Sequence, residues 1–334
     1  MKKALGLVLL ATAALAAEGY HVVGKIHIGG PGGWDYLAMD TSSHRLFVSN
    51  STRVVVVDVD AGKVVGEIPD TQGVHGIAFA PSLNRGFTSN GRANTVTIFD
   101  LKTLQKIGEA KAGTNPDAIA YEPKTQRVFT FNGRSGDSTA IDAKTGTVVG
   151  TFALGGKPEF AVVDGTGKIY DNLEDKSEIV EIDAQKMAVL RRFPLAPCES
   201  PSGLAIDTAH HKLFSVCENK MMAVTDYESG KVVATAPIGS GPDAAAFDPG
   251  AGIAFSSNSE GTLTLVRDVN GKYEAVDTVN TERSARTMTV DPKTHRVYLS
   301  AAEYGPMPAS APGEKRRGRP PVVADSFHVL VVGK

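Results

Sequence analysis

The sequence has few of the residues and motifs that indicate a particular catalytic or binding function. It contains only two cysteines among 334 residues, which excludes a disulfide-stapled miniprotein and a four-cysteine zinc site. Its 35 Lys and Arg residues nearly balance 37 Asp and Glu residues, so no overall charge attracts nucleic acid or an anionic membrane. It has no phosphate-binding loop, HExxH motif, EF-hand loop or GxSxG motif. Its function must therefore lie in how ordinary polar residues are arranged.

Long apolar runs are also missing, since none reaches the ~18 residues of a membrane-spanning helix. The run Ala4–Leu15 follows Lys2 and Lys3 and ends among the alanines around Ala14–Ala17, a pattern typical of a secretory signal peptide. We expect residues 1–17 to be removed and residues 18–334 to form a single periplasmic or secreted domain without membrane insertion. An oxidising compartment of this kind permits a disulfide.

One pattern recurs seven times along the chain. Copies such as AMDTSSHRLFVSN, from Ala38, and AYEPKTQRVFTFN, from Ala120, join two β-rich stretches through a polar turn. Successive anchors of the pattern are 40 to 43 residues apart. A period near 42 residues with only β-type signals predicts an all-β, seven-bladed β-propeller with four-stranded antiparallel blades. The anchors are Asp40, Ala80, Glu122, Asp164, Asp207, Asp248 and Asp291.

The two ends of the chain supply complementary strands. The stretch His21–Ile28 has the pattern of a fourth strand, as in Lys63–Ile68, whereas Phe327–Val332 has the pattern of a third strand. The seventh blade is therefore predicted to be closed by both termini, which leaves no open sheet edge.

The repeat resembles the YVTN-type β-propeller repeat of exported YncE-like proteins. The segments His44–Ile68 and Gln126–Phe152 carry this resemblance, which covers nearly all of the mature chain. It implies the fold strongly and the function weakly, because propellers host many unrelated activities. Single-stranded DNA binding has been attributed to the family's namesake. The chain departs from the pattern in the sixth repeat, at the turn Asp268–Lys272, and in the short hairpin at Gly165–Gly167.

Seven positions share one place in the repeat but differ in residue type, and these form the candidate site. Each lies five residues before an anchor, where the chain enters the innermost strand, so ring closure brings all seven to one channel mouth. Four of them are carboxylates, which repel one another unless a cation or Arg286 intervenes. Such a ring of oxygen ligands suits Ca²⁺ or Mg²⁺, and the imidazole of His75 would also suit Mn²⁺ or Zn²⁺. Alternatively, these side chains simply face the water in the channel. The seven residues are Asp35, His75, Asp117, Glu159, Ser202, Asp243 and Arg286, and the predicted metal ligands are Asp35, Asp117, Glu159 and Asp243.

Loops expected at the same mouth add further candidate ligand-binding residues. Arg92 and Arg134 each follow an Asn-Gly pair. The Asn-Gly-Arg sequence either simply forms a turn or places the two arginines so that they bind a carboxylate or phosphate between them. Trp34, the only tryptophan, is either a stacking platform or part of the core.

The cysteines Cys198 and Cys217 border the first two strands of the fifth blade and are predicted to meet at this mouth. We expect a disulfide that fixes the loop presenting Ser202; a copper or zinc site with His75 is the alternative. In contrast, the histidines that recur before the second strand are read as framework, namely His44, His211 and His295.

The seventh repeat carries an insertion, Glu303–Asp325, rich in Pro, Ala and charge. A loop of this composition is expected to be flexible, and it could cover the mouth. Its segment Arg316–Pro321 resembles the core of a minor-groove AT-hook, but the neutral, exported chain argues against nucleic acid and favours a solvated basic loop.

These observations lead to three functional hypotheses. The first is an exported propeller, expected to be a monomer, that binds a small molecule or a protein at the mouth. The second is a metal-dependent hydrolase or lyase resembling propeller lactonases, with a divalent cation on the carboxylates and His75 as the candidate general base. The third is single-stranded nucleic-acid binding through Arg92, Arg134 and the insertion.

Overall fold

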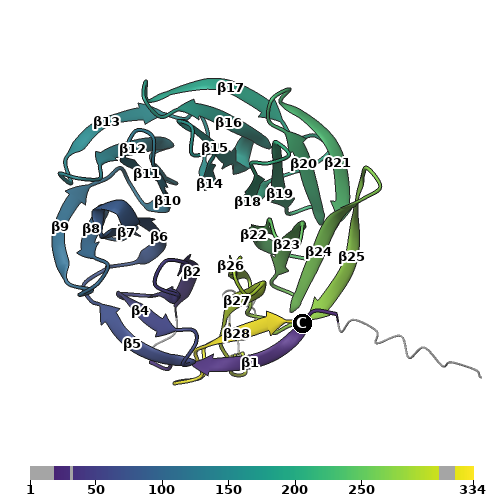
Figure 1. Cartoon of the computed structure of the whole chain (residues 1–334), viewed down its shortest axis with the longest axis horizontal. Coiled ribbons are helices and arrows are strands. Elements are labelled where there is room, and N and C mark those ends of the chain that lie inside the picture. The colour runs from purple at the N-terminus through teal and green to yellow at the C-terminus, as the bar shows by residue number, and fades with distance from the viewer. Residues whose placement is uncertain (1–18, 31–32, 308–319) are drawn as a thin grey trace, which may run out of the picture.

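The computed structural model describes residues 19–30, 33–307 and 320–334 and shows seven four-stranded antiparallel sheets arranged in a ring (Figure 1). Each sheet is one blade, and the blades stand radially around a central channel. The sequence prediction of a seven-bladed β-propeller is confirmed. The predicted signal peptide lies outside the described residues.

The strands of each blade follow the chain outward from the channel. The innermost strands are β2 (Trp34–Asp40), β6 (Val74–Ala80), β10 (Pro116–Glu122), β14 (Pro158–Val163), β18 (Pro201–Asp207), β22 (Pro242–Asp248) and β26 (Thr287–Asp291). The second strands are β3 (Arg45–Asn50), β7 (Arg85–Asn90), β11 (Arg127–Asn132), β15 (Lys168–Leu173), β19 (Lys212–Cys217), β23 (Ile253–Asn258) and β27 (Arg296–Ala301). The third strands are β4 (Arg53–Asp58), β8 (Thr95–Asp100), β12 (Asp137–Asp142), β16 (Glu178–Asp183), β20 (Met221–Asp226), β24 (Thr262–Val269) and β28 (His328–Gly333). The outer strands are β5 (Lys63–Ile68), β9 (Lys106–Lys111), β13 (Val148–Ala153), β17 (Ala188–Pro194), β21 (Lys231–Pro237), β25 (Lys272–Asn280) and β1 (His21–His27).

The seventh blade combines both ends of the chain, as the sequence predicts. Its strand order is β26, β27, β28 and β1, and β1 pairs antiparallel with β28 from His21 opposite Gly333 to His27 opposite His328. Figure 1 shows the purple β1 alongside the yellow β28.

The hydrophobic core consists of layers between neighbouring blades. The second and third strands are buried almost throughout, since a neighbouring blade covers each face, whereas the outer strand β5 is mostly exposed. Phe47 of blade 1, for example, packs against Phe79 and Phe99 of blade 2, with ring centroids 4.9 and 5.8 Å apart. Close packing between these layers holds the channel-facing strands in place.

The repeated histidines and aspartates have structural roles. Asp100 accepts hydrogen bonds from the backbone N–H groups of Lys102 and Thr103 and so closes the turn after its strand. His44 contacts Asp291 of the neighbouring seventh blade through Nε2, at 2.9 Å, and His295 contacts Asp248 of the sixth blade at 2.7 Å. These histidines therefore link adjacent blades, in agreement with their interpretation as framework.

Helical structure is limited to two short 3₁₀ turns in the described part of the chain, η1 (Pro81–Leu83) and η2 (Glu174–Lys176). Among the residues that the structure describes, no helix has the length and apolar character needed to cross a membrane.

Candidate functional site

The channel mouth is formed where the innermost strands begin. The loops between second and third strands lie on this same face, because backbone hydrogen bonds tie them to the loops that enter the innermost strands. Gly91 N–H donates to Gly73 C=O at 2.8 Å, and Gly133 N–H donates to Asn115 C=O at 2.9 Å. The two loop sets therefore form one continuous surface around the channel.

The backbone at this mouth is held from one blade to the next. The Ser89 hydroxyl of blade 2 donates to the carbonyl of Asp117 in blade 3. The Thr287 hydroxyl of blade 7 donates to the carbonyl of Asp35 in blade 1 at 2.6 Å, and Ser257 donates to the carbonyl of Arg286. Because these bonds fix the main chain, the side chains of the mouth start from rigid positions.

Three predicted site residues from adjacent blades meet at the mouth. His75 Nδ1 lies 2.5 Å from Asp35 Oδ2 and 3.7 Å from Asp117 Oδ1. One potential ligand atom from each of these three residues lies within 4.8 Å of the other two. Gly91 packs against the imidazole, and a Cβ atom at this glycine would lie 2.6 Å from His75 Nε2. The Asp35–His75–Asp117 cluster is thus compact, partly buried and backed by the protein on one side.

Electrostatics perturb the cluster in a way that is typical of functional sites. Burial lowers the pKa of His75, but the hydrogen bond to Asp35 and the charges of Asp117 and Asp35 outweigh it, so the pKa is raised. Burial raises the pKa of Asp117 to about 6; His75 opposes this shift, and the charges of Asp35 and Asp243 reinforce it. The raised pKa of Asp117 therefore reflects its burial first and the neighbouring carboxylates second.

The remaining ring carboxylates are engaged by basic residues. Arg286 contacts Asp243 and also Asp35, with Arg286 Nη2 3.5 Å from Asp35 Oδ1. Lys157 contacts Glu159 at 2.6 Å as well as Glu174. Of the four predicted metal ligands, Asp35 and Asp117 thus join His75, whereas Asp243 and Glu159 contact basic residues; Asp35 does both, since Arg286 also reaches it.

Sequence reasoning missed Lys157, because it lies outside the ring position, two residues before Glu159. Even with this partner, burial raises the pKa of Glu159 to about 7; Lys157 opposes the shift, and the charges of Asp117 and Glu174 reinforce it. A residue beside a ring position is invisible to a search that compares only equivalent repeat positions.

Two aromatic residues narrow the channel next to the ring. Tyr36 follows Asp35 in blade 1, and Phe160 follows Glu159 in blade 4; their ring centroids are 5.0 Å apart. Strands β2 and β14 lie on opposite sides of the channel (Figure 1), so this pair crosses it. Burial, followed by the charges of Asp117 and the other ring carboxylates, raises the pKa of Tyr36 well above its usual range. The mouth therefore has an apolar floor.

Asp171 is a second feature that sequence reasoning missed. Its side chain is fully buried, and neither carboxyl oxygen has a hydrogen-bond partner among the described residues. Burial, reinforced by the charge of Glu159, raises its pKa well above the usual range. Asp171 occupies the repeat position of Val48 and Thr88, so a lone carboxyl among these residues was the available signal.

The other predicted residues surround the cluster without joining it. Trp34 stacks on Phe327 with centroids 5.4 Å apart, so that residue already covers one face of the indole. The Ser202 hydroxyl donates to the carbonyl of Pro242 at 3.2 Å. Arg92 and Arg134 are exposed, and within the described residues neither forms an ion pair with a ring carboxylate. Trp34 also packs against the core between blades 7 and 1, in agreement with the core alternative for this residue.

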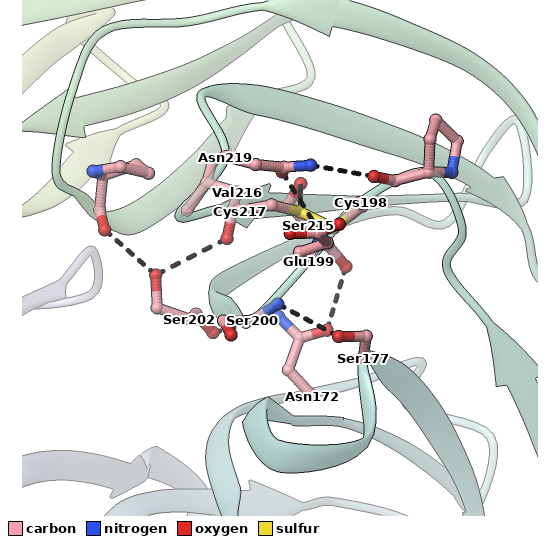
Figure 2. Close-up of a disulfide and its surroundings, with 12 residues drawn as sticks. Asn172, Ser177, Cys198, Glu199, Ser200, Ser202, Ser215, Val216, Cys217 and Asn219 are labelled. Carbon is pink, nitrogen blue, oxygen red and sulfur yellow. Dashed lines mark hydrogen bonds between the residues drawn. A yellow bond between two sulfur atoms is a disulfide. The ribbon is translucent and has the colours of Figure 1, made fainter.

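The predicted disulfide between Cys198 and Cys217 is present, with Cα atoms 5.7 Å apart. Figure 2 shows how hydrogen bonds support the loop that it closes. Ser200 N–H donates to Ser177 Oγ at 3.1 Å, and Asn219 Nδ2 donates to Pro197 C=O at 2.8 Å. Because the sulfurs are bonded to each other, the alternative of a copper or zinc site with His75 is wrong.

The base of the predicted insertion is ordered by two backbone hydrogen bonds. Gly305 N–H donates to Pro321 C=O at 2.8 Å, and Val323 N–H donates to Glu303 C=O at 2.9 Å. Residues 308–319, which include most of the basic segment Arg316–Pro321, lie outside the described residues.

Comparisons with known proteins agree on the architecture. The structure is similar to a chain of Kuenenia stuttgartiensis hydrazine synthase, with a TM-score of 0.71 and 17% identity over 82% of this chain and 94% of that one. It is also similar to U3-55K and to the WD40 repeats of RRP9, each with a TM-score of 0.74 and 9% identity over 92% of this chain and 97% of the other. No protein-family model and no curated protein matches the sequence. The class is therefore that of seven-bladed β-propellers, and identities this low establish the fold alone.

Proposed function

We propose that this chain is an exported, YncE-like binding propeller that recognises a positively charged ligand at the channel mouth. The sequence resemblance and the apolar N-terminal run support export, and the disulfide between Cys198 and Cys217 is compatible with an oxidising compartment. A cleaved leader of residues 1–17 is part of this proposal.

The Asp35–His75–Asp117 cluster is the observation that carries the proposal. Three groups from three blades converge there, and their backbones are held in place before any ligand arrives. The raised pKa of Asp117 and of Glu159 means that both carboxylates would become easier to ionise beside an added cation. A protonated amine or a metal ion satisfies this demand, and the floor of Tyr36 and Phe160 gives an organic ligand an apolar surface.

A metal-dependent hydrolase is the second candidate, because the cluster has a plausible ligand set for a divalent ion. One imidazole and two carboxylates suit Mn²⁺ or Zn²⁺ better than they suit Ca²⁺, which prefers ligands that are all oxygen atoms. His75 would then be a ligand and could not also be the general base. Glu159, with a pKa of about 7, is suited to hold and release a proton near neutral pH.

Metal content tests the second candidate. The protein would be purified without chelators or metal-affinity tags, and bound metals would be measured by mass spectrometry before and after addition of Mn²⁺ and Zn²⁺. One equivalent that disappears in Asp117→Asn but persists in Glu218→Gln, an exposed carboxylate on a loop of the same face, supports the metal site. A screen of lactone and ester hydrolysis would follow.

Amine binding tests the first candidate directly. Calorimetric titration with a set of small primary amines and their uncharged alcohol analogues should show binding of the amines that is weakened at least tenfold in Asp117→Asn. Equal binding of the alcohols, or no loss in the variant, refutes recognition of positive charge at this mouth. Salt-sensitive binding of single-stranded DNA instead would favour the nucleic-acid hypothesis.

A further inference from the structure

A cavity of about 710 Å³ lies between blades 5 and 6, away from the channel mouth. It is lined by the hairpin between β18 and β19 and by the hairpin between β24 and β25. These hairpins follow the ends of innermost and third strands, whereas the mouth is formed where innermost strands begin. The cavity therefore opens on the opposite face of the ring and is independent of the proposed function.

Five of the blades close the equivalent gap with an apolar residue directly after the third strand. In blades 1 to 5 this residue is buried between neighbouring blades. In blade 6 the third and fourth strands continue as a regular ladder as far as Val269 opposite Lys272, and Asp268 occupies the equivalent position. The apolar filler is therefore missing at this junction, as it is at the junction of blades 6 and 7, where the exposed Lys334 has the equivalent position. The five buried residues are Val59, Leu101, Ala143, Ala184 and Tyr227.

A second closing contact is also absent there. In blades 1 to 3 an arginine at the start of the second strand reaches a carbonyl of the next blade, as Arg85 does to Ala143 at 3.1 Å and Arg127 does to Ala184 at 2.8 Å. Blade 5 has Lys212 at this position, and its Nζ contacts Asp226 at 2.9 Å within its own blade. Two departures from the repeat thus open the same gap.

Three aromatic side chains line part of the cavity. Phe214 and Phe247 stack with centroids 5.3 Å apart and an interplanar angle of 13°. Tyr273, on the extended β25, meets Phe214 edge-on at 5.8 Å. Phe247 and Tyr273 are only partly buried, so their surfaces are available to a planar ring.

Other charged groups at the rim already have partners within the described residues. Asp207 is bound by His210 at 2.7 Å, Asp268 accepts the N–H of Gly271 at 2.6 Å, and Lys212 is paired with Asp226. Arg267 lies at the rim and, among the described residues, forms no ion pair. Its planar guanidinium is suited to bind a carboxylate with two hydrogen bonds.

We propose that this interblade cavity binds a planar aromatic carboxylate, with the ring against Phe247 and Tyr273 and the carboxylate on Arg267. The volume lies within the usual range for small-molecule sites, roughly 300–1,000 Å³. Aromatic contact supplies the apolar surface, and the arginine fixes the orientation of the ligand.

The experiment uses 2-naphthoate as the probe and the full mature chain as the protein. Calorimetric titration and saturation-transfer NMR should detect saturable binding of 2-naphthoate, weaker binding of 2-naphthylmethanol and the weakest binding of 2-naphthylmethylamine. Arg267→Gln should weaken 2-naphthoate about tenfold, the loss expected for one charge-assisted contact. Tyr273→Leu should weaken all probes, because it removes an aromatic wall.

Matched controls make the result specific. Lys272→Gln removes a neighbouring exposed charge that does not line the cavity, and His75→Ala alters the mouth on the opposite face; neither should change the affinity for 2-naphthoate. Circular dichroism melts would establish that each variant is folded. The proposal is overturned by the absence of saturable binding, by equal binding of the amine, or by an unchanged affinity in Arg267→Gln.

Discussion

Replacing Gly91 with alanine tests whether the imidazole of His75 is held rigidly at the mouth. The added Cβ would lie 2.6 Å from Nε2 and 2.7 Å from Cδ2 of His75, well inside van der Waals contact. One of the two groups must therefore move. Because the imidazole of His75 is hydrogen-bonded to Asp35 through Nδ1, moving the imidazole breaks that hydrogen bond.

The expected cost follows from the contacts that are lost. A hydrogen bond to a charged group contributes about 1.5–3 kcal/mol, whereas replacing glycine with alanine at a permitted backbone conformation returns about 0.4–1 kcal/mol through the unfolded chain. We expect Gly91→Ala to lower the free energy of unfolding by about 1–2 kcal/mol, measured by urea denaturation. It should also weaken ligand or metal binding at the mouth.

Gly133→Ala is the matched control, because Gly133 occupies the equivalent position in blade 3. The nearest atom to its Cβ would be Asn115 Nδ2 at 3.5 Å, an ordinary contact. This variant should be neutral or slightly more stable, so the two alanine variants should differ by about 2 kcal/mol. Equal stabilities, with unchanged binding in both, would refute the idea that His75 is fixed by its surroundings.

Three further predictions concern the framework. Asp171→Val, which copies Val48 of blade 1, should stabilise the protein by about 1–3 kcal/mol at pH 8 in urea denaturation. Since the pKa of Asp171 is raised, the wild type loses stability as pH rises, and the gain from the substitution should be smaller at pH 4. A variant less stable than the wild type at pH 8 would contradict this account. His44→Gln should lower the free energy of unfolding by about 1 kcal/mol at pH 5.5 and by less at pH 9. Hydrogen bonds to two carboxylates raise the pKa of His44, and their contribution to stability is lost as the pH rises through that pKa. A loss of stability that does not change with pH would exclude this linkage. The double variant Cys198→Ala/Cys217→Ala should lose about 3 kcal/mol, the value for a closed loop with a sequence separation of 19, and unchanged stability in urea would contradict it.

The fold was predictable from the sequence because the same physical constraint repeats in every blade. Each middle strand is covered on both faces, which demands a run of apolar residues, and each turn needs a residue such as Asp100 to bind free backbone amides. A period near 42 residues then counts the blades. Closure was predictable because His21–Ile28 resembles an outer strand that lacks the rest of its blade.

The site was predictable only in part. Comparing equivalent positions identified Asp35, His75 and Asp117, because position in the repeat determines position around the channel. It named Arg286 as a counter-charge but could not show which carboxylates Arg286 would contact, and it did not find Lys157, since side-chain pairing depends on distances that the repeat does not encode.

The contact between Tyr36 and Phe160 joins blades 1 and 4 across the channel. The two residues occupy equivalent repeat positions, directly after Asp35 and Glu159, but the repeat does not show that side chains three blades apart would touch. The cavity between blades 5 and 6 was signalled only as an irregular turn at Asp268–Lys272. Its origin needed a comparison of that turn with the buried residues of the other blades.

The pairing of β1 with β28 also determines when the ring can be completed. Strand β1 is made first, yet its only partner in the sheet is the final strand of the chain, about 300 residues later. Until β28 arrives, the unpaired edge of β27 remains open and the ring cannot close. The circular fold is therefore sealed only after β28 has been made and has paired with β1.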